Sequence, residues 1–410
     1  MSWPRAQIRL LAQLGTGHTP SRSVPEYWEN CNIPWLTLAD VGGLRDGSVQ
    51  VVRSTKERIS SIGLANSAAV LHPAGTVVMS RTASVGYSAI LGVDAATSQD
   101  YVTWTCGERL HPRFLYWVLQ GERSQIIGRM QGSTHKTIYM PDIEELTTPV
   151  PPLAEQRAIA DHLDTEAARI DALITKKQQL IHLLEERWTS AVARAVAPTG
   201  SLTSVSLDES WPTAAFGSVV RIAEGQVDPR IEPWASMPLV APNHIESRTG
   251  RLLGLQSAAE QGAISGKYVC EPGDVIYSKI RPALAKAVLA AGHWLCSADM
   301  YPLRAGPALR PEFLRLLVLS PPFTDLATVE SDRVAMPKIN RDALGRVRVP
   351  IPSLDRQDQI VTELAGLTAE RDRLTEKLAT QVELLAERRS ALVAASVTGQ
   401  NSSISAGGRA

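Results

Sequence analysis

Few residues in this sequence stand at the spacing that catalysis requires. Gly262 and Gly266 precede Lys267, but their spacing differs from the G-x-x-x-x-G-K-[ST] phosphate-binding loop, and no Ser or Thr follows to hold magnesium. Gly15 and Gly17 lack the third glycine of a dinucleotide-binding turn. The motifs H-E-x-x-H and G-x-S-x-G are absent, and the eight histidines are scattered without the spacing of metal ligands. We therefore expect no cofactor, no metal site and no catalysis by the chain alone, which favours a recognition protein or a scaffold.

Composition and charge are those of an ordinary globular protein. The sequence holds 44% hydrophobic and 20% charged residues, and 42 Lys and Arg balance 42 Asp and Glu. This balance argues against an independent DNA-binding clamp, which often carries a basic excess. The four cysteines lie far apart without a C-x-x-C pair, so we expect free thiols in a reducing cytosol. No signal peptide and no apolar run of membrane-spanning length is present, which predicts a cytoplasmic protein without membrane contact.

An internal repeat organises the chain. Residues 150–163 align with residues 351–364 at an offset of 201, and the alignment continues without a gap to Val196 and Val397. So long an ungapped match indicates that half of the chain is a duplicate of the other half. The identical pairs at the start of the alignment are Pro151/Pro352, Leu153/Leu354, Gln156/Gln357, Ile159/Ile360 and Leu163/Leu364.

Each copy of the repeat predicts one long helix, because Pro is tolerated at a helix start and no Pro follows for roughly 45 residues. Apolar residues recur at alternating three- and four-residue steps, which is the pattern of a coiled-coil seam. At 1.5 Å per residue each helix would be on the order of 65 Å long. Helices of this length need a partner, so we expect the two to pair. The predicted seam comprises Leu163, Ile170, Ile174, Ile181, Leu184, Trp188, Leu364, Leu367, Leu374, Leu378, Leu385 and Leu392.

Two segments of about 150 residues flank the first predicted helix. Their short apolar runs, frequent Gly and Pro and weak helical periodicity indicate α/β domains. They resemble each other faintly: residues 73–81 match 272–279 as a turn that leads into a strand, and residues 111–119 match 310–318 as a helix begun by Pro. The expected order is an α/β domain in 1–150, a helix in 151–200, an α/β domain in 201–350, a helix in 351–398 and a disordered tail in 399–410.

The helix entry V-P-P-L-A-E-Q-R-A-I-A-x-x-L at 150–163, its copy at 351–364 and the α/β segments before them resemble the DNA specificity subunits of type I restriction-modification enzymes. This resemblance extends to about residue 398. It implies two target-recognition domains, each of which reads one half of a bipartite DNA sequence, separated by two long antiparallel coiled-coil helices in a pseudo-twofold repeat.

The resemblance also implies partners. These are double-stranded DNA with a split recognition sequence, two adenine methyltransferase (modification) subunits and, where restriction occurs, ATP-dependent restriction subunits; the partner subunits carry the catalysis. The second helix entry departs from the first, since Asp355 and Arg356 stand where the first has Ala154 and Glu155.

Polar side chains at matched places in the two domains are candidates for contacts with DNA bases. Cations follow the strand after each Gly turn, and further polar residues stand shortly before each long helix. Arg or Lys paired with guanine is the commonest specific contact. Half-sites read on one face of DNA lie roughly 34 Å apart, so the helix length would act as a ruler. The candidates are Arg81, Thr82, His135 and Lys136 in the first domain and Lys279, Arg281, Lys338 and Asn340 in the second.

Two alternatives stay open at this stage. A coiled-coil scaffold whose globular domains bind protein would show no sequence-selective DNA contact, even with partners present. A fused restriction or methylation enzyme would be active as the purified chain. A neighbouring gene for an adenine methyltransferase would favour the specificity subunit over both.

Overall fold

The computed structural model describes residues 3–45, 47, 49–131, 136–197, 202, 211–331 and 337–400. The candidate His135 and most of the predicted tail, from residue 401 on, lie outside the described residues. The chain divides into two compact units: unit 1 comprises Met1–Lys176 and Gln381–Ala410, and unit 2 comprises Lys177–Thr380.

Unit 1 contains a five-stranded sheet, a four-stranded sheet and a two-stranded ribbon. The five-stranded sheet has the order β2-β10-β7-β8-β4, with strands Ala12–Thr16, Tyr101–Cys106, Val77–Ser80, Ser88–Leu91 and Val51–Val52. The second sheet has the order β5-β3-β9-β6, with strands Glu57–Ile59, Ile33–Leu36, Ala95–Thr97 and Leu71–His72. The ribbon pairs β1 (Arg5–Gln7) with β11 (Thr147–Pro149). The helices are α1 (Val41–Arg45), α2 (Ser61–Ala65), α3 (Pro112–Gly121), α4 (Arg123–Gly128) and α5 (Met140–Glu144), with 3-10 turns at Ile8–Leu10, Pro25–Trp28 and Leu38–Asp40.

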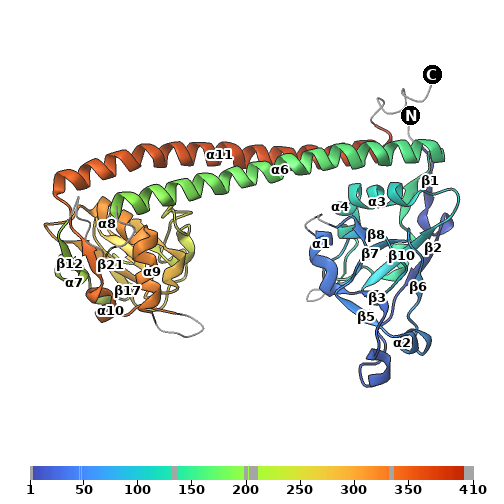
Figure 1. Ribbon diagram of the computed structural model, residues 1–410, viewed down its shortest axis with the longest axis horizontal. Coiled ribbons are helices and arrows are strands. Elements are labelled where there is room, and N and C mark those ends of the chain that lie inside the picture. The colour runs from blue at the N-terminus through green and yellow to red at the C-terminus, as the bar shows by residue number, and fades with distance from the viewer. Residues whose placement is uncertain are drawn as a thin grey trace. The chain divides into compact units, whose positions relative to one another are not determined.

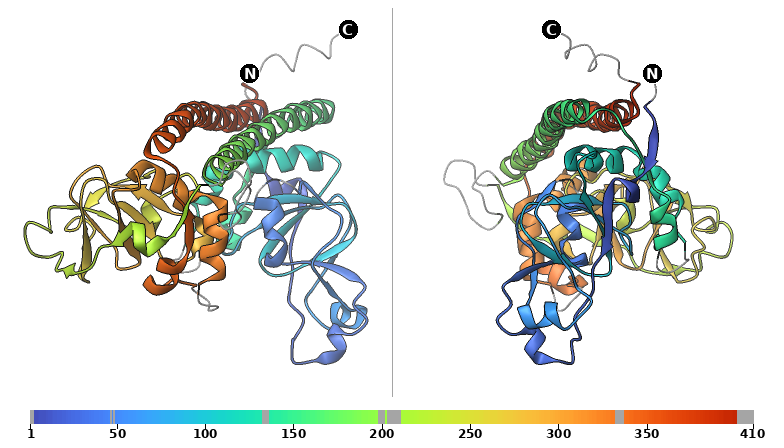
Figure 2. Two further views of the ribbon diagram at one scale, coloured as in Figure 1. Left: turned by 60° about the vertical axis from the view of Figure 1, so that its left-hand side comes forward. Right: turned by 90° about the vertical axis from the view of Figure 1, so that its right-hand side faces the viewer.

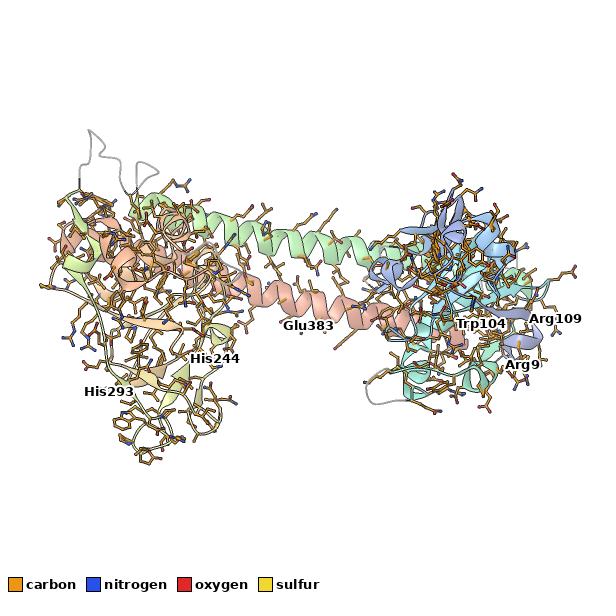
Figure 3. The ribbon with its side chains drawn as sticks, turned by 90° about the horizontal axis from the view of Figure 1, so that it is seen from below. Arg9, Trp104, Arg109, His244, His293 and Glu383 are labelled. Atoms are coloured by element: carbon orange, nitrogen blue, oxygen red, sulfur yellow. The ribbon has the colours of Figure 1, made fainter. Side chains whose placement is uncertain are left out.

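The five-stranded sheet of unit 1 is buried on both faces. Side chains alternate along a strand, so Val77 and Met79 of β7 enter the core that also holds Trp104 and α3, whereas Val78 enters the core toward the second sheet. Trp104 is labelled in Figure 3. In Figure 1, α3 lies between this sheet and the long helices, and β3, β5 and α2 form the end of unit 1 that is remote from them. The fully buried strand β7, with its run Val77–Val78–Met79, therefore reflects burial between two layers.

Unit 2 repeats this arrangement. Its sheets have the orders β13-β21-β18-β19 and β14-β17-β20-β15-β16, and β12 pairs with β22. Both units contain an equivalent parallel pair, β3 with β9 and β15 with β20, and unit 1 has a further one, β4 with β8. The strands are β12 (Thr213–Ala215), β13 (Val220–Ile222), β14 (Gln226–Val227), β15 (Pro238–Val240), β16 (Gln256–Ser257), β17 (Lys267–Cys270), β18 (Val275–Ser278), β19 (Ala287–Leu289), β20 (Trp294–Cys296), β21 (Met300–Ala305) and β22 (Arg348–Pro350). The helices are α7 (Phe216–Val219), α8 (Pro311–Leu319), α9 (Pro321–Val329) and α10 (Arg341–Arg346), with 3-10 turns at Pro242–His244 and Pro282–Leu284.

Two long helices complete the fold, α6 (Leu153–Val196) and α11 (Leu354–Thr398). Within each unit, segments of the two lie side by side (Figures 1 and 2). The ion pair between Asp171 and Arg389 (2.8 Å) joins them in unit 1, and Trp188 Nε1 donates to Thr368 Oγ1 (2.9 Å) in unit 2. These contacts show antiparallel helices, since residues later in α6 meet residues earlier in α11. The predicted fold class, two α/β modules with two long antiparallel helices in an internal repeat, is confirmed.

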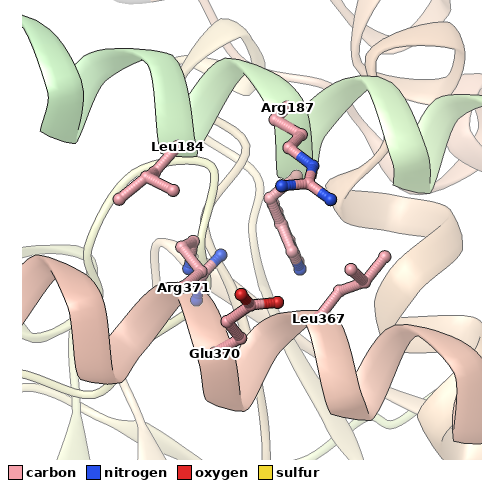
Figure 4. A pocket seen from close by; sticks show the side chains of 6 residues that line it. Leu184, Arg187, Leu367, Glu370 and Arg371 are labelled. Carbon is pink, nitrogen blue, oxygen red and sulfur yellow. The ribbon is translucent and has the colours of Figure 1, made fainter.

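The predicted seam residues are all buried or half-buried. Leu163 and Leu364, near the helix starts, also pack into the cores of the globular parts of units 1 and 2. In unit 2, the guanidinium of Arg371 lies 4.4 Å from the ring centroid of Trp188. Figure 4 shows the small pocket beside this stack, with Leu184 from α6 and Leu367 from α11 at its walls.

A fully buried glutamine in each unit explains the sequence of the helix entry. In unit 1, Gln156 Oε1 accepts from the His111 N–H (2.8 Å), and Nε2 donates to the carbonyls of Arg109 and Pro151 (both 2.9 Å). Unit 2 has the same contacts: Gln357 Oε1 accepts from Arg310 N–H (2.8 Å), and Nε2 donates to the carbonyls of Ala308 (2.9 Å) and Pro352 (2.8 Å). The glutamine thus fastens the loop before α3 or α8 to the start of the long helix.

A second polar contact fixes α6 to the globular part of unit 1. Both oxygens of Asp164 accept hydrogen bonds: from Arg113 (2.6 Å), from Trp117 Nε1 (2.8 Å) and from Gln50 Nε2 (3.0 Å). At an offset of 201 the equivalent residue in unit 2 is Ala365, so this contact belongs to unit 1 alone. The two modules have the same backbone fold but differ in the side chains that attach each long helix to its module.

Candidate nucleic-acid interface

In unit 1, the hairpin loop between β7 and β8 contacts the segment before α5. The Arg81 N–H donates to the Asp100 carbonyl (2.8 Å), and the Arg81 carbonyl accepts from the Ile138 N–H (3.0 Å). The Ala83 N–H donates to the Lys136 carbonyl (3.0 Å). The structure thus brings Arg81, Thr82 and Lys136 together, although more than 50 residues separate them in the sequence. Residues 80–87 with 136–138 are called loop pair 1 below.

Unit 2 has the same backbone arrangement. The Lys279 N–H donates to the Asp299 carbonyl (3.0 Å), and the Lys279 carbonyl accepts from the Ile339 N–H (2.9 Å). The Arg281 N–H donates to the Pro337 carbonyl (2.7 Å). Three of the four candidates of this unit, Lys279, Arg281 and Lys338, therefore lie on two adjoining segments. Residues 278–287 with 337–339 are called loop pair 2 below.

Asn340 directly follows loop pair 2 and acts as a helix cap. Its side-chain oxygen accepts from the Ala343 N–H (2.8 Å) at the start of α10. The cap uses one lone pair of Oδ1, so the amide nitrogen and the second lone pair are left to contact a base.

Both loops hold a residue with a left-handed backbone at the same place. Ala83 has φ +57° and Arg281 has φ +47°. A non-glycine residue in this conformation costs roughly 1–2 kcal/mol, and such residues concentrate at functional sites. The matched strain indicates that the turn, and with it the direction of the side chains, is determined by the surrounding hydrogen bonds.

The candidate cations differ in exposure. Lys136, Arg281 and Lys338 are exposed, whereas Arg81 and Lys279 are half-buried. Among the described residues, none of these five forms an ion pair with a carboxylate. Unpaired cations of this kind on two equivalent loops suit contact with a negatively charged or acceptor-rich ligand.

The structure adds aromatic residues that the sequence did not reveal. In unit 2, Tyr301 is buried with Lys279 Nζ at 5.1 Å and the Arg341 guanidinium at 4.9 Å from its ring centroid. Burial raises the pKa of the Tyr301 phenol, although Arg341 acts in the opposite direction. In unit 1, Tyr87 has Arg45 and Arg123 near its ring. Arg341 adjoins a candidate in the sequence, but no spacing signals the tyrosines or the other arginines.

His244 belongs to the framework of unit 2. His244 Nδ1 accepts from the Ala241 N–H (3.2 Å), and Figure 3 shows His244 and His293 well apart in unit 2. Across the described residues, no three His, Cys, Asp or Glu side chains gather as a metal site. The described helices include none that is long and apolar enough to cross a membrane.

Comparison with known proteins shows what this chain is similar to. Residues 3–183 match the family model of the type I restriction modification DNA specificity domain. The type I restriction enzyme EcoDI specificity subunit of Escherichia coli is 32% identical over 292 residues, which cover 65% of this chain and 64% of the relative. Over these residues the chain is similar to type I restriction specificity subunits.

Two other relatives are less similar to this chain. The EcoBI specificity subunit of Escherichia coli is 24% identical over 294 residues, covering 66% of this chain and 62% of the relative. The MjaIX specificity subunit of Methanocaldococcus jannaschii is 23% identical over 258 residues, covering 59% and 58%. The chain therefore spans about three fifths of the length of the curated relatives that it matches.

Solved structures show the same fold. A chain from work on the assembly and conformational transition of the type I R-M system has a TM-score of 0.73 at 17% identity, covering 97% of this chain and 98% of that chain. The HsdS subunit of Thermoanaerobacter tengcongensis has a TM-score of 0.50 at 17% identity and 97% coverage of both chains. The fold of this chain is thus shared with these solved structures at low sequence identity.

Proposed function

We propose that the chain is the DNA specificity subunit of a type I restriction-modification complex. It reads a bipartite DNA target and directs adenine methylation and restriction by partner subunits. The observation that carries this proposal is the occurrence of one loop arrangement twice, with unpaired cations on both copies, in a chain that is similar to type I specificity subunits. Repeated loops with different side chains suit two different half-sites.

Domain roles follow from this proposal. Residues 1–150 and 201–350 are the target-recognition domains, and residues 151–200 and 351–398 are the spacer helices. Arg81, Thr82, His135 and Lys136 contact the first half-site, and Lys279, Arg281, Lys338 and Asn340 contact the second. Because the side chains of the two loops differ, the target is asymmetric.

Partner subunits supply the chemistry. The proposed partners are two adenine methyltransferase subunits and, where restriction occurs, ATP-dependent restriction subunits, all in the cytoplasm. Apolar side chains on the long helices support a role for these helices in assembly, since exposed leucines otherwise cost solubility. The exposed leucines are Leu173 (41%) and Leu384 (58%) in unit 1 and Leu180 (46%) and Leu183 (57%) in unit 2.

A genome-wide map of adenine methylation tests the proposal. Cells that carry the cognate methyltransferase are compared with and without this chain. A split motif with a fixed gap, present only with the chain, is the expected result. A stable complex with an active methyltransferase that yields no new motif would favour the scaffold and overturn the proposed function.

A further inference from the structure

Two arginines in unit 1 are stacked on the tyrosine that ends loop pair 1. The Arg123 guanidinium lies 4.0 Å from the ring centroid of Tyr87, and that of Arg45 lies 5.8 Å from it. Arg45 Nη2 also donates to Ser84 Oγ (2.6 Å) within the loop. These residues come from α1, the β7–β8 hairpin and α4, so three separate elements form one arginine cluster: Arg45, Tyr87 and Arg123.

The cluster carries positive charge that no described carboxylate balances. The ion pairs of unit 1 involve neighbouring arginines instead, such as Arg113 with Asp161 and Arg129 with Glu145. The Nε of Arg123 is buried and has no described hydrogen-bond partner. The side chain of Arg123 as a whole is half-buried, so an anionic oxygen can reach its accessible nitrogens and balance the charge.

The cluster is held in place before any ligand arrives. Gly86 has φ +81°, and a Cβ there would lie 3.3 Å from Arg123 Cγ, so glycine allows the arginine to pack against the turn. The loop is closed by hydrogen bonds from the Ser80 N–H to the Tyr87 carbonyl and from the Gly86 N–H to the Ser80 carbonyl (both 2.9 Å). Stacking on an aromatic ring restricts a guanidinium to one plane, which reduces the entropy lost on binding.

Unit 2 has a lysine where unit 1 has Tyr87. The Ser278 N–H donates to the Lys286 carbonyl (2.9 Å), as the Ser80 N–H donates to the Tyr87 carbonyl in unit 1. The Lys286 ammonium in turn donates to the Pro242 carbonyl (2.6 Å). The two modules therefore differ at this place, since unit 2 has no tyrosine there on which arginines could stack.

We propose that Arg45 and Arg123 bind a backbone phosphate of the DNA beside the first half-site and fix the register of that module, while loop pair 1 reads the bases. This inference rests on the proposed function and assigns a separate task within it. A phosphate carries a full negative charge and accepts several charge-assisted hydrogen bonds, whereas a guanine edge is neutral and accepts one guanidinium. Two guanidiniums that lie against one tyrosine ring, without an ion pair to a described carboxylate, therefore match a phosphate, which positions the protein without reading sequence.

The test uses the full chain in complex with its methyltransferase, on duplexes that carry the motif from the methylation map. Arg45→Gln and Arg123→Gln are each expected to weaken binding about tenfold. The double variant is expected to lower the slope of log Kd against log salt concentration by about 2, with the methylation motif unchanged. Arg123→Lys keeps the charge and is expected to keep the slope.

Matched variants control for surface charge and for folding. Arg129→Gln removes an arginine just after the same short helix that is already paired with Glu145 (3.4 Å), and it is expected to leave the slope near that of the wild type. Tyr87→Phe keeps the ring and is expected to bind like the wild type. Thermal unfolding of every variant shows that the module is folded.

Three results would overturn the inference. A folded double variant with wild-type affinity and slope would show that no phosphate is bound there. A double variant whose methylation motif changes in the first half-site would make the arginines base readers. A wild-type chain that produces no motif at all would remove the proposed function, and this inference with it.

Discussion

At the scale of single residues, buried polar groups connect the modules to the helices. Gln156 and Gln357 are identical in the repeat because each satisfies one backbone N–H and two carbonyls that would otherwise be buried without partners. No other side chain of this length offers a donor and an acceptor in one plane. The glutamine in the family-like helix entry therefore has a structural cause.

Removing this amide is expected to destabilise the fold. Gln156→Leu keeps a similar volume but leaves three backbone groups unsatisfied, so the free energy of unfolding should fall by about 3 kcal/mol. Urea denaturation of the full chain measures the loss. Gln179→Leu changes an exposed glutamine on the same helix and should have little effect. Equal losses for both variants would contradict the role assigned to Gln156.

Two histidines of unit 1, the buried His72 and the half-buried His111, are expected to make its stability depend on pH. Burial lowers the pKa of His72 below its ordinary value of 6.5, and burial with nearby Arg113 and Arg157 lowers the pKa of His111. Below pH 6.5 the unfolded chain therefore binds protons that the folded chain does not. The stabilisation is complete above pH 6.5 and is lost as the pH falls through the lowered folded-state values.

Unfolding free energies at pH 7.5, 6.5 and 5.5 are accordingly expected to decrease in that order. His72→Gln should flatten this dependence, because it removes one of the two titrating groups. A variant with the same pH profile as the wild type would show that His72 does not contribute.

At the scale of elements, the two loop pairs are the proposed recognition surfaces. In each, the end of an inner strand, β7 or β18, is hydrogen-bonded to the segment that leads to the long helix. The backbone is therefore the same in both units and the side chains differ. Recognition can change by substitution on these loops without change to the core.

Substitutions on the two loops are expected to act on separate half-sites. Arg81→Ala should relax the first half of the methylated motif and Lys279→Ala the second, each with a loss of discrimination of about 10- to 100-fold at one base pair. Methylation mapping of each variant measures this. If either substitution altered both halves, or neither, the assignment of these side chains to base contacts would be wrong.

At the scale of the whole molecule, α6 and α11 each run without a break through residues of both units. A continuous helix has a fixed rise per residue, so its length is a property of the sequence. Within each unit the helices are fastened to the globular part by buried polar side chains and by apolar packing. The number of helical residues should therefore determine the gap in the DNA target.

Lengthening both helices tests this expectation. Seven residues inserted after Lys176 and seven after Thr380 keep the heptad register and add roughly 10 Å. The gap between the half-sites is expected to grow by about three base pairs, since DNA rises 3.4 Å per base pair. The methylation motif reports the new gap directly. An unchanged gap would show that the helices do not set the spacing.

Much of this architecture could be predicted from the sequence, because its signals are local or repeated. The seam leucines recur at helical spacing, and Pro marks the start of each helix, so α6 and α11 fall within their predicted ranges. Matched turns at residues 75 and 273 placed the strands β7 and β18, since both glycines have the positive φ such turns need. The internal repeat made the second module a copy of the first.

The tertiary structure alone decided which distant residues meet. Backbone hydrogen bonds join the segment that holds Arg81 to the segment that holds Lys136. Arg45, Tyr87 and Arg123 come from three elements, and no local sequence pattern indicates that these elements meet. The same holds for Asp164, whose partners come from three separate places in the sequence. Hydrophobic periodicity indicates which face of one segment is buried in the core, whereas a site depends on how separate elements pack against each other. The sequence by itself therefore determined the elements, their order and their duplication, and the packing determined the surfaces proposed to contact DNA.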